Sequence, residues 1–126
     1  MGQVMNRIAA SSIGILQAKL WYIQRISAMV LGLCVAIHLV GIFYAIRGGL
    51  TAQEILDRTQ NNLLFAIFYE VFVLACVAHA PIGMANILQE NFPKMRIAKL
   101  VSWILACLIL VLGTTAVVGL YSGGGL

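Results

Sequence analysis

The stretch ISAMVLGLCVAIHLVGIFYAI, from Ile26 to Ile46, contains 21 residues and no formally charged side chain. A helix needs about 20 mainly apolar residues to cross the roughly 30 Å hydrocarbon core of a bilayer. Two further stretches meet this requirement: Leu63–Leu88, in which only Glu70 is charged, and the uncharged Leu100–Leu120. Because a segment in lipid must satisfy its backbone hydrogen bonds internally, we expect three helices rather than strands.

The composition agrees with a membrane protein. Of 126 residues, 62% are hydrophobic and only 10% are charged, whereas about 25% of the residues of a soluble domain are charged. The net charge of +4 comes from scattered cations, which argues against nucleic acid as a partner. We predict an all-α integral membrane protein, a single domain over residues 1–126, with spans at about 20–47, 62–89 and 97–121. We expect it to form part of a larger helix bundle.

The cations predict the orientation. Six lie in the N-terminal segment and in the loop between the second and third spans, whereas the loop between the first and second spans has two cations and two carboxylates. The positive-inside rule therefore places the N-terminus in the cytoplasm and the C-terminus outside. Residues 1–19 are of mixed polarity, so we expect no cleaved signal peptide. We predict a multi-pass protein of the bacterial inner (cytoplasmic) membrane. The six cations are Arg7, Lys19, Arg25, Lys94, Arg96 and Lys99.

Local motifs mark the ends of the spans. Gly48-Gly49 predicts the end of the first helix, and the sequence from Thr51 to Glu54 is typical of a capping box that begins a short outer helix. Asn61-Asn62 precedes the second span, and residues 91–93 separate the second span from the third. Small residues within the spans favour close packing against other helices. These are Gly32, Gly41, Ala75, Gly83, Gly113 and Gly119.

Three polar side chains in the spans are functional candidates, because burying such groups in lipid is costly. They are His38, Glu70 and His79, and both histidines of the chain are among them. Each histidine shares a helix face with small residues, which would leave space for a flat macrocycle. Burial favours neutral imidazole, a good ligand of haem iron. The alternative is that each histidine forms a hydrogen bond to a neighbouring helix. The small residues are Ser27, Cys34 and Gly41 beside His38, and Ala75, Cys76 and Gly83 beside His79.

The depths of these residues suggest separate sites. At 1.5 Å per residue, His79 lies nearer the cytoplasm than His38 by roughly 12 Å. With that offset the two histidines cannot bind one iron, and each haem needs a second ligand from another chain. The offset almost disappears if depth is counted from Arg25, so it depends on Arg25 lying within the membrane. Glu70, level with His38, could accept a hydrogen bond from His38, relay protons, or pair with a cation of a partner.

A polar cluster at the start of the first span is a candidate quinone site. Trp21, Gln24, Arg25 and Ser27 combine hydrogen-bond donors with an aromatic ring within two turns. A quinone needs donors to its carbonyl oxygens and an apolar slot for its ring. The alternative is an interfacial anchor, in which Arg25 extends to lipid phosphate.

These motifs resemble the cytochrome b membrane anchors of succinate dehydrogenase and fumarate reductase, the succinate:quinone oxidoreductase family. Such anchors commonly carry His-Arg-x-[Ser/Thr]-Gly at the start of the first helix and a His followed by Gly late in the second. The matching elements here are Gln24-Arg25-Ile-Ser27 and His79 with Gly83, and the resemblance covers about residues 17–90. Gln24 replaces the usual His, Ala28 replaces the Gly, and Trp21 stands where many members have a serine.

The resemblance implies a role for each matching residue. His79 would be an axial ligand of haem b, Arg25 would lie near the quinone, and His38 resembles the first-helix ligand of the two-haem members. It also implies a flavoprotein subunit, an iron–sulfur subunit and a second three-helix anchor as partners, in a respiratory complex of the tricarboxylic acid cycle. This chain would carry electrons between the iron–sulfur subunit and quinone, without catalytic residues for the dicarboxylate.

Two other functions are compatible with the same residues. The chain could be a small proton-coupled transporter or channel subunit that uses Glu70 and His38. It could also be a structural membrane subunit without a cofactor.

Overall fold

The computed structural model describes residues 1–93 and 96–124, and α-helix is the only regular secondary structure within them. The helices are α1 (Gly2–Gly48), α2 (Ala52–Thr59), α3 (Leu63–Asn91) and α4 (Ala98–Ser122). By length and composition α1, α3 and α4 can cross a membrane; their best 18-residue windows have mean hydropathies of 2.4, 2.1 and 2.4. The predicted all-α fold with three potential spans is confirmed, and α2 is the expected short outer helix. Lys94, one of the six predicted inner cations, lies outside the described residues.

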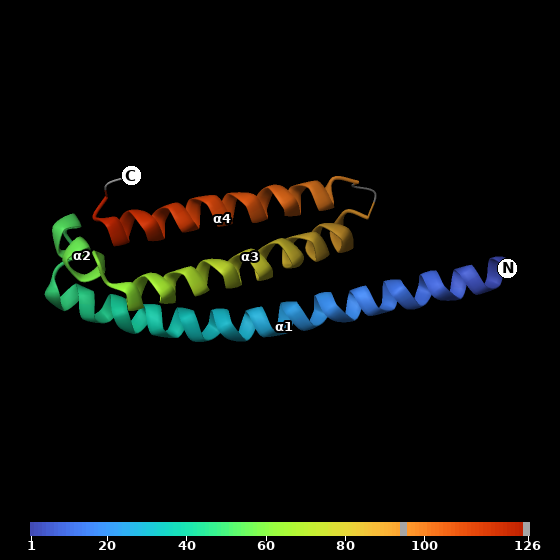
Figure 1. Ribbon diagram of the computed structural model, residues 1–126, viewed down its shortest axis with the longest axis horizontal. Coiled ribbons are helices and arrows are strands. Elements are labelled where there is room, and N and C mark those ends of the chain that lie inside the picture. Colours follow the sequence, from blue (N-terminus) through green and yellow to red (C-terminus); the bar gives the residue numbers. More distant parts are fainter. Residues whose placement is uncertain (94–95, 125–126) are drawn as a thin grey trace.

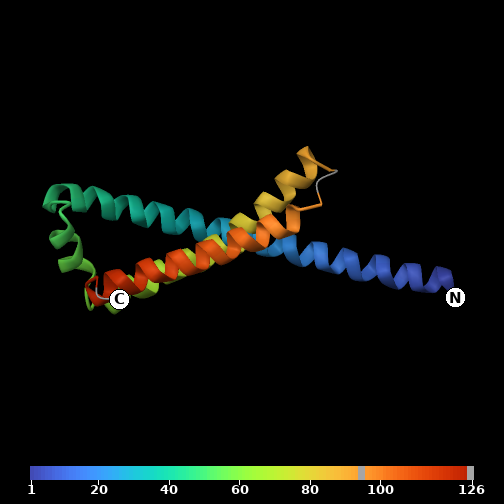
Figure 2. The ribbon, with the colours of Figure 1, turned by 90° about the horizontal axis from the view of Figure 1, so that it is seen from above.

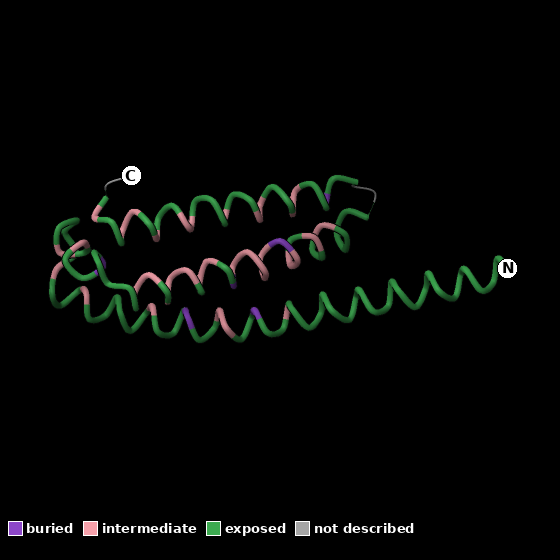
Figure 3. Tube along the Cα trace, in the orientation of Figure 1, coloured by how far each residue is buried: buried purple, intermediate pink, exposed green. Residues whose placement is uncertain are grey.

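The three long helices form a layer in which α3 lies between α1 and α4 (Figure 1). Seen from above, α1 crosses the α3–α4 pair at an angle (Figure 2). The helices α3 and α4 approach each other closely at Gly113 of α4, where a Cβ atom would lie 2.7 Å from Cγ1 of Val73 in α3. Few residues are buried, and those of α1 and α3 lie in the middle of the layer (Figure 3). Both broad faces of the layer are therefore left for lipid or for other helices.

The first helix is longer than the sequence predicts. It begins at Gly2 rather than near residue 20, and its 47 residues extend about 70 Å, more than twice the thickness of the hydrocarbon core. Residues 1–23 are exposed (Figure 3), and the N-terminal part of α1 projects beyond the ends of α3 and α4 (Figure 1). This part contains no proline that would interrupt the helix. Its mixed polarity gives no continuous apolar run, so the sequence did not predict that the helix begins so early.

The connection from α1 to α2 is built as the motifs predict. Gly49 has a φ of 104°, which only glycine adopts readily, and a Cβ there would collide with the Glu54 carboxylate. The Thr51 side chain accepts a hydrogen bond from the backbone amide of Glu54. The Glu54 carboxylate in turn accepts a hydrogen bond from the backbone amide of Thr51 at 2.9 Å. The capping box is thus confirmed. The hydrogen bonds from the Thr51 side chain and backbone lower the pKa of Glu54.

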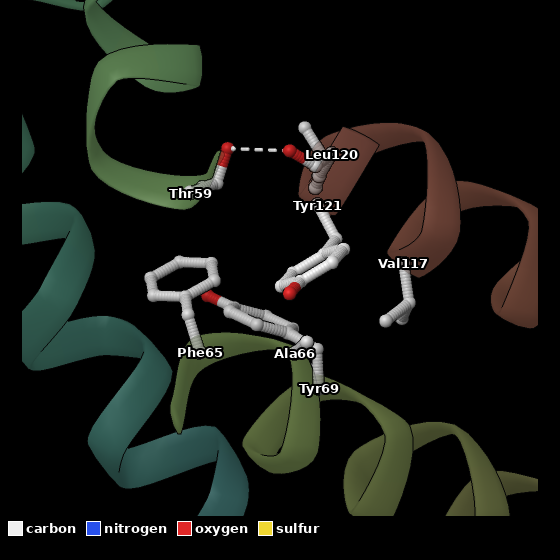
Figure 4. A pocket seen from close by; sticks show the side chains of 7 residues that line it. All are labelled: Thr59, Phe65, Ala66, Tyr69, Val117, Leu120 and Tyr121. Carbon is white, nitrogen blue, oxygen red and sulfur yellow. Dashed lines mark hydrogen bonds between the residues drawn. The ribbon is translucent and has the colours of Figure 1, made fainter. Parts of the chain in front are cut away.

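Hydrogen bonds join the outer ends of α2 and α4. The Thr59 hydroxyl donates to the Leu120 carbonyl at 3.2 Å, drawn as the dashed line in Figure 4. The rings of Tyr69 and Tyr121 point into a small cavity beside this bond (Figure 4). Its volume of about 10 Å³ is that of roughly one water molecule. This cavity is therefore too small to hold a cofactor.

Candidate functional site

His79 of α3 lies against the first turns of the predicted first span. Its Nδ1 is 3.4 Å from the Gln24 carbonyl oxygen and 3.4 Å from Oγ of Ser27. The Ser27 hydroxyl itself donates to the Gln24 carbonyl at 3.1 Å. A carbonyl only accepts hydrogen bonds, so a hydrogen bond from His79 to the Gln24 carbonyl requires the tautomer with the proton on Nδ1. In that tautomer Nε2 of His79 keeps its lone pair.

The other ring nitrogen of His79 has no hydrogen-bond partner within residues 1–93 and 96–124. Histidines that bind metals usually donate their remaining N–H to a carbonyl, carboxylate or water, which fixes the ring. The surroundings are small and polar: a Cβ added to Gly83 would lie 3.1 Å from Nε2 of Gln24, and Oε1 of Gln24 is buried without a partner. The surroundings of His79 are therefore compatible with His79 as an axial ligand of haem.

His38 of α1 is bound to a residue that the sequence analysis did not select. Its Nδ1 lies 2.7 Å from the Tyr69 hydroxyl, and its ring meets those of Tyr69 and Phe72 edge to face at 5.6 and 5.9 Å. A hydroxyl can donate or accept, so Tyr69 does not determine which ring nitrogen of His38 carries the proton. If Nε2 binds a metal, Nδ1 must donate and Tyr69 must accept.

The two histidines occupy different levels of the layer. Ser27 and His38 are 11 residues apart in α1, and their respective partners, His79 and Tyr69, are 10 residues apart in α3. This separation corresponds to about 15 Å along the helices. The predicted offset is confirmed by contacts that do not involve Arg25. One iron cannot be bound by both histidines of the same chain.

Glu70 faces a different helix from its neighbour Tyr69. The Thr114 hydroxyl of α4 donates to Oε1 of Glu70 at 3.0 Å, whereas Tyr69 binds His38 of α1. The suggested hydrogen bond from His38 to Glu70 is therefore wrong, because adjacent residues of a helix point about 100° apart. The proton relay and the pairing with a partner's cation stay predictions.

The four predicted quinone residues divide into two groups. Gln24 and Ser27 face α3 and surround His79. Arg25 and Trp21 are exposed, with the guanidinium carbon 5.5 Å from the centroid of the indole ring. The four side chains thus do not line a single slot between the helices of this chain. A quinone at Arg25 and Trp21 would be bounded on its other side by lipid or by a partner.

No cluster of three or more His, Cys, Asp or Glu side chains suited to a metal ion occurs in the described part of the chain. A haem needs only axial ligands from protein, since its macrocycle supplies the other bonds to iron.

Sequence reasoning missed Tyr69 and Thr114. Both are polar groups inside predicted spans, and a search that included hydroxyl groups would have found them. The role of the Gln24 carbonyl could not be found in this way, because every residue has one and only packing brings this one to His79.

Comparisons of the chain with protein-family models, with curated proteins and with solved structures found no match.

Proposed function

We propose that this chain is a haem-binding membrane anchor of the succinate:quinone oxidoreductase family, carrying electrons between an iron–sulfur subunit and quinone. The observation that supports the proposal best is the environment of His79. The Gln24 carbonyl accepts a hydrogen bond from Nδ1 of His79, and Nε2 of His79 has no hydrogen-bond partner in the described chain. The motif resemblance points to the same residue.

In this proposal each residue has a definite task. The Gln24 carbonyl and Ser27 hold the His79 ring and fix its tautomer, so that Nε2 can bind iron. Tyr69 holds the His38 ring for a second haem b and, in that role, accepts the hydrogen bond from Nδ1. Haem iron supplies one-electron transfer. Because the histidines are about 15 Å apart along the helices, each would hold a different haem, and each haem would need a further ligand from a second three-helix anchor subunit.

Quinone would bind at the cytoplasmic end, where Arg25 donates to a carbonyl oxygen and the Trp21 ring provides apolar contact. Gln24 and Ser27 would affect quinone only indirectly, since both are turned towards His79. The flavoprotein and iron–sulfur subunits would dock on this side and carry out the dicarboxylate chemistry. In this proposal the complex lies in the bacterial inner membrane.

An optical spectrum of the purified complex tests the haem assignment. After reduction with dithionite we expect the sharp alpha band of low-spin haem b. His79→Ala and His38→Ala should each remove one haem, whereas Cys76→Ala, a change three residues before His79, should remove none. A colourless complex, or full haem content in His79→Ala, would contradict the assignment.

Quinone turnover tests the role of Arg25 separately. Arg25→Gln should lower quinone turnover and leave the haem spectrum unchanged, because the side chain is exposed and does not contact either histidine. Arg7→Gln removes the same charge from the same helix and serves as the control. Equal turnover in the two variants would exclude a specific role for Arg25.

A proton-coupled transporter or channel subunit is the second candidate, and the Glu70–Thr114 hydrogen bond is the observation in its favour. An ionisable group inside a span is typical of proton pathways. This candidate requires a colourless protein whose proton-dependent uptake is lost in Glu70→Gln. Thr114→Val should impair that uptake, whereas Thr115→Val, one residue away and without a bond to Glu70, should not.

A further inference from the structure

A groove of about 640 Å³ lies where α1, α3 and α4 approach one another at the predicted cytoplasmic end. Ligand sites usually have volumes of roughly 300–1,000 Å³. Leu16 and Leu20 of α1 form one wall, and α3 and α4 form the remainder. Neither histidine lines the groove, nor does Arg25, so it is separate from the proposed haem and quinone sites.

Polar and apolar residues occupy different parts of this groove. Asn86 and Gln89 belong to the last turns of α3, and Lys99 and Ser102 to the first turns of α4, so the polar groups gather at the cytoplasmic end. The walls deeper in the layer are apolar and include Val77, Pro81, Ile82 and Ala106. This division matches an amphiphile whose polar head lies at the membrane surface.

The charge at the polar end favours an anionic head group. Lys99 lines the groove and forms no ion pair within residues 1–93 and 96–124, and no carboxylate lines the groove with it. The Ser102 hydroxyl already donates to the Ala98 carbonyl at 2.9 Å. Lys99, the indole N–H of Trp103 and the amide groups of Asn86 and Gln89 are thus the donors left for a ligand.

We propose that the groove binds one anionic phospholipid. The lipid phosphate lies at Lys99, with Asn86 and Gln89 as further donors, and an acyl chain follows the apolar walls. Trp103, also in the lining, lies at the depth where tryptophan favours the membrane interface. A neutral quinone would gain little from the charge of Lys99, and a zwitterionic lipid would bring its own cation close to it.

Native mass spectrometry of the purified full-length protein tests the head-group preference, using equimolar phosphatidylglycerol and phosphatidylcholine. We expect one phosphatidylglycerol to be retained in preference to phosphatidylcholine. Lys99→Gln should reduce this preference about fivefold, the usual effect of one lysine near an anionic membrane surface. Arg96→Gln removes the same charge three residues away and outside the groove lining, and should leave the preference unchanged.

A second pair of variants tests the groove itself. Ala85→Phe places a large ring in the lining and should displace the lipid, whereas Ala116→Phe adds the same ring to an exposed position of α4 and should not. Equal retention of both lipids by the natural chain would overturn the proposal. So would equal effects of Lys99→Gln and Arg96→Gln, or a retained quinone in place of the lipid. The measurement does not depend on haem, so it stands or fails independently of the proposed electron transfer.

Discussion

At the scale of single residues, both histidines have the same arrangement: Nδ1 faces an oxygen atom of the neighbouring helix, and Nε2 is without a protein partner in the described chain. Their partners differ in chemistry. A carbonyl holds His79 in one tautomer, whereas the Tyr69 hydroxyl permits either tautomer of His38. If the proposed haem binding is correct, the ring of His79 is therefore held more definitely for that role than the ring of His38.

Tyr69→Phe should destabilise the protein by about 0.6 kcal/mol, and by no more than about 1.7 kcal/mol, the average and the largest value measured for hydrogen bonds between membrane helices. The substitution keeps the ring but leaves Nδ1 of His38 without a partner. Tyr121→Phe is the matched control, because the Tyr121 hydroxyl forms no hydrogen bond with any described residue. The free energy of unfolding in detergent is the measurement, and equal losses in the two variants would refute the contribution of the His38–Tyr69 bond.

At the scale of elements, helix ends and close approaches determine the shape of the layer. The Thr51–Glu54 capping box begins α2, and the Thr59–Leu120 hydrogen bond holds α2 against α4. Gly113 lets α4 approach α3 closely, while Gly32 and Gly41 have no atoms within 4 Å of an added Cβ. The last two glycines are therefore available for a partner helix rather than for packing within this chain.

The capping box should weaken in acid. The pKa of Glu54 is lowered by its hydrogen bonds to Thr51, so the open cap binds a proton more readily than the closed cap. The capping box contributes fully to the stability of α2 at a pH above the ordinary pKa of a carboxyl group. That contribution is lost as the pH falls through the lowered pKa of Glu54. Protection of the Glu54 amide from hydrogen exchange should therefore decrease in acid.

Glu54→Gln supplies the control for this titration. Glutamine can complete a capping box but does not titrate. In the Glu54→Gln variant, the hydrogen-exchange protection of the backbone amide at position 54 should therefore not change over the pH range in which the Glu54 carboxyl group titrates. A natural chain whose protection stayed constant through the same pH range would show that the carboxylate is not needed to close the cap.

Gly113→Ala should cost about 1–3 kcal/mol of unfolding free energy, which is typical of overpacking. Its Cβ would lie 2.7 Å from Val73. Gly32→Ala should have no such cost in the isolated chain, because nothing lies near its Cβ. Adding Val73→Ala to Gly113→Ala should restore part of the loss. Equal stabilities of the two glycine variants would contradict the close α3–α4 contact.

At the scale of the whole molecule, a layer of three helices buries few side chains. The core contains small residues such as Cys34 and Ala75, and most large apolar side chains are exposed. In a bilayer this surface is satisfied by lipid or by other helices, and in the proposed function the remaining ring nitrogens of the two histidines would bind haem iron. The layer is thus suited to assembly with other membrane helices, as the proposed function requires.

The orientation can be measured with single cysteines in a chain whose native cysteines are replaced by alanine. Ser11→Cys, on the projecting part of α1, should react with a membrane-impermeant maleimide only from the cytoplasmic side. Gln53→Cys, exposed on α2, should react only from the outside. The physical reason is the excess of cations at the first position and their balance by carboxylates at the second. Labelling from the opposite sides would reverse the topology and place the groove at the outer surface.

The sequence by itself determined the helices, since hydropathy and length decide which segments can cross a bilayer, and local motifs such as Thr51–Glu54 and Gly49 decide where helices end. It also identified the two imidazoles within the spans and their different levels, because helical rise follows directly from residue number. The full length of α1 escaped prediction because residues 2–19 lack a continuous apolar run.

Only the tertiary structure decided which polar groups meet. His79 with the Gln24 carbonyl, His38 with Tyr69, and Glu70 with Thr114 depend on how the helices are rotated against one another. A rotation of a fraction of a turn exchanges one partner for another without changing the hydropathy of any span. The groove beside Lys99 was likewise invisible in the sequence, because its walls come from three helices that approach one another only after folding.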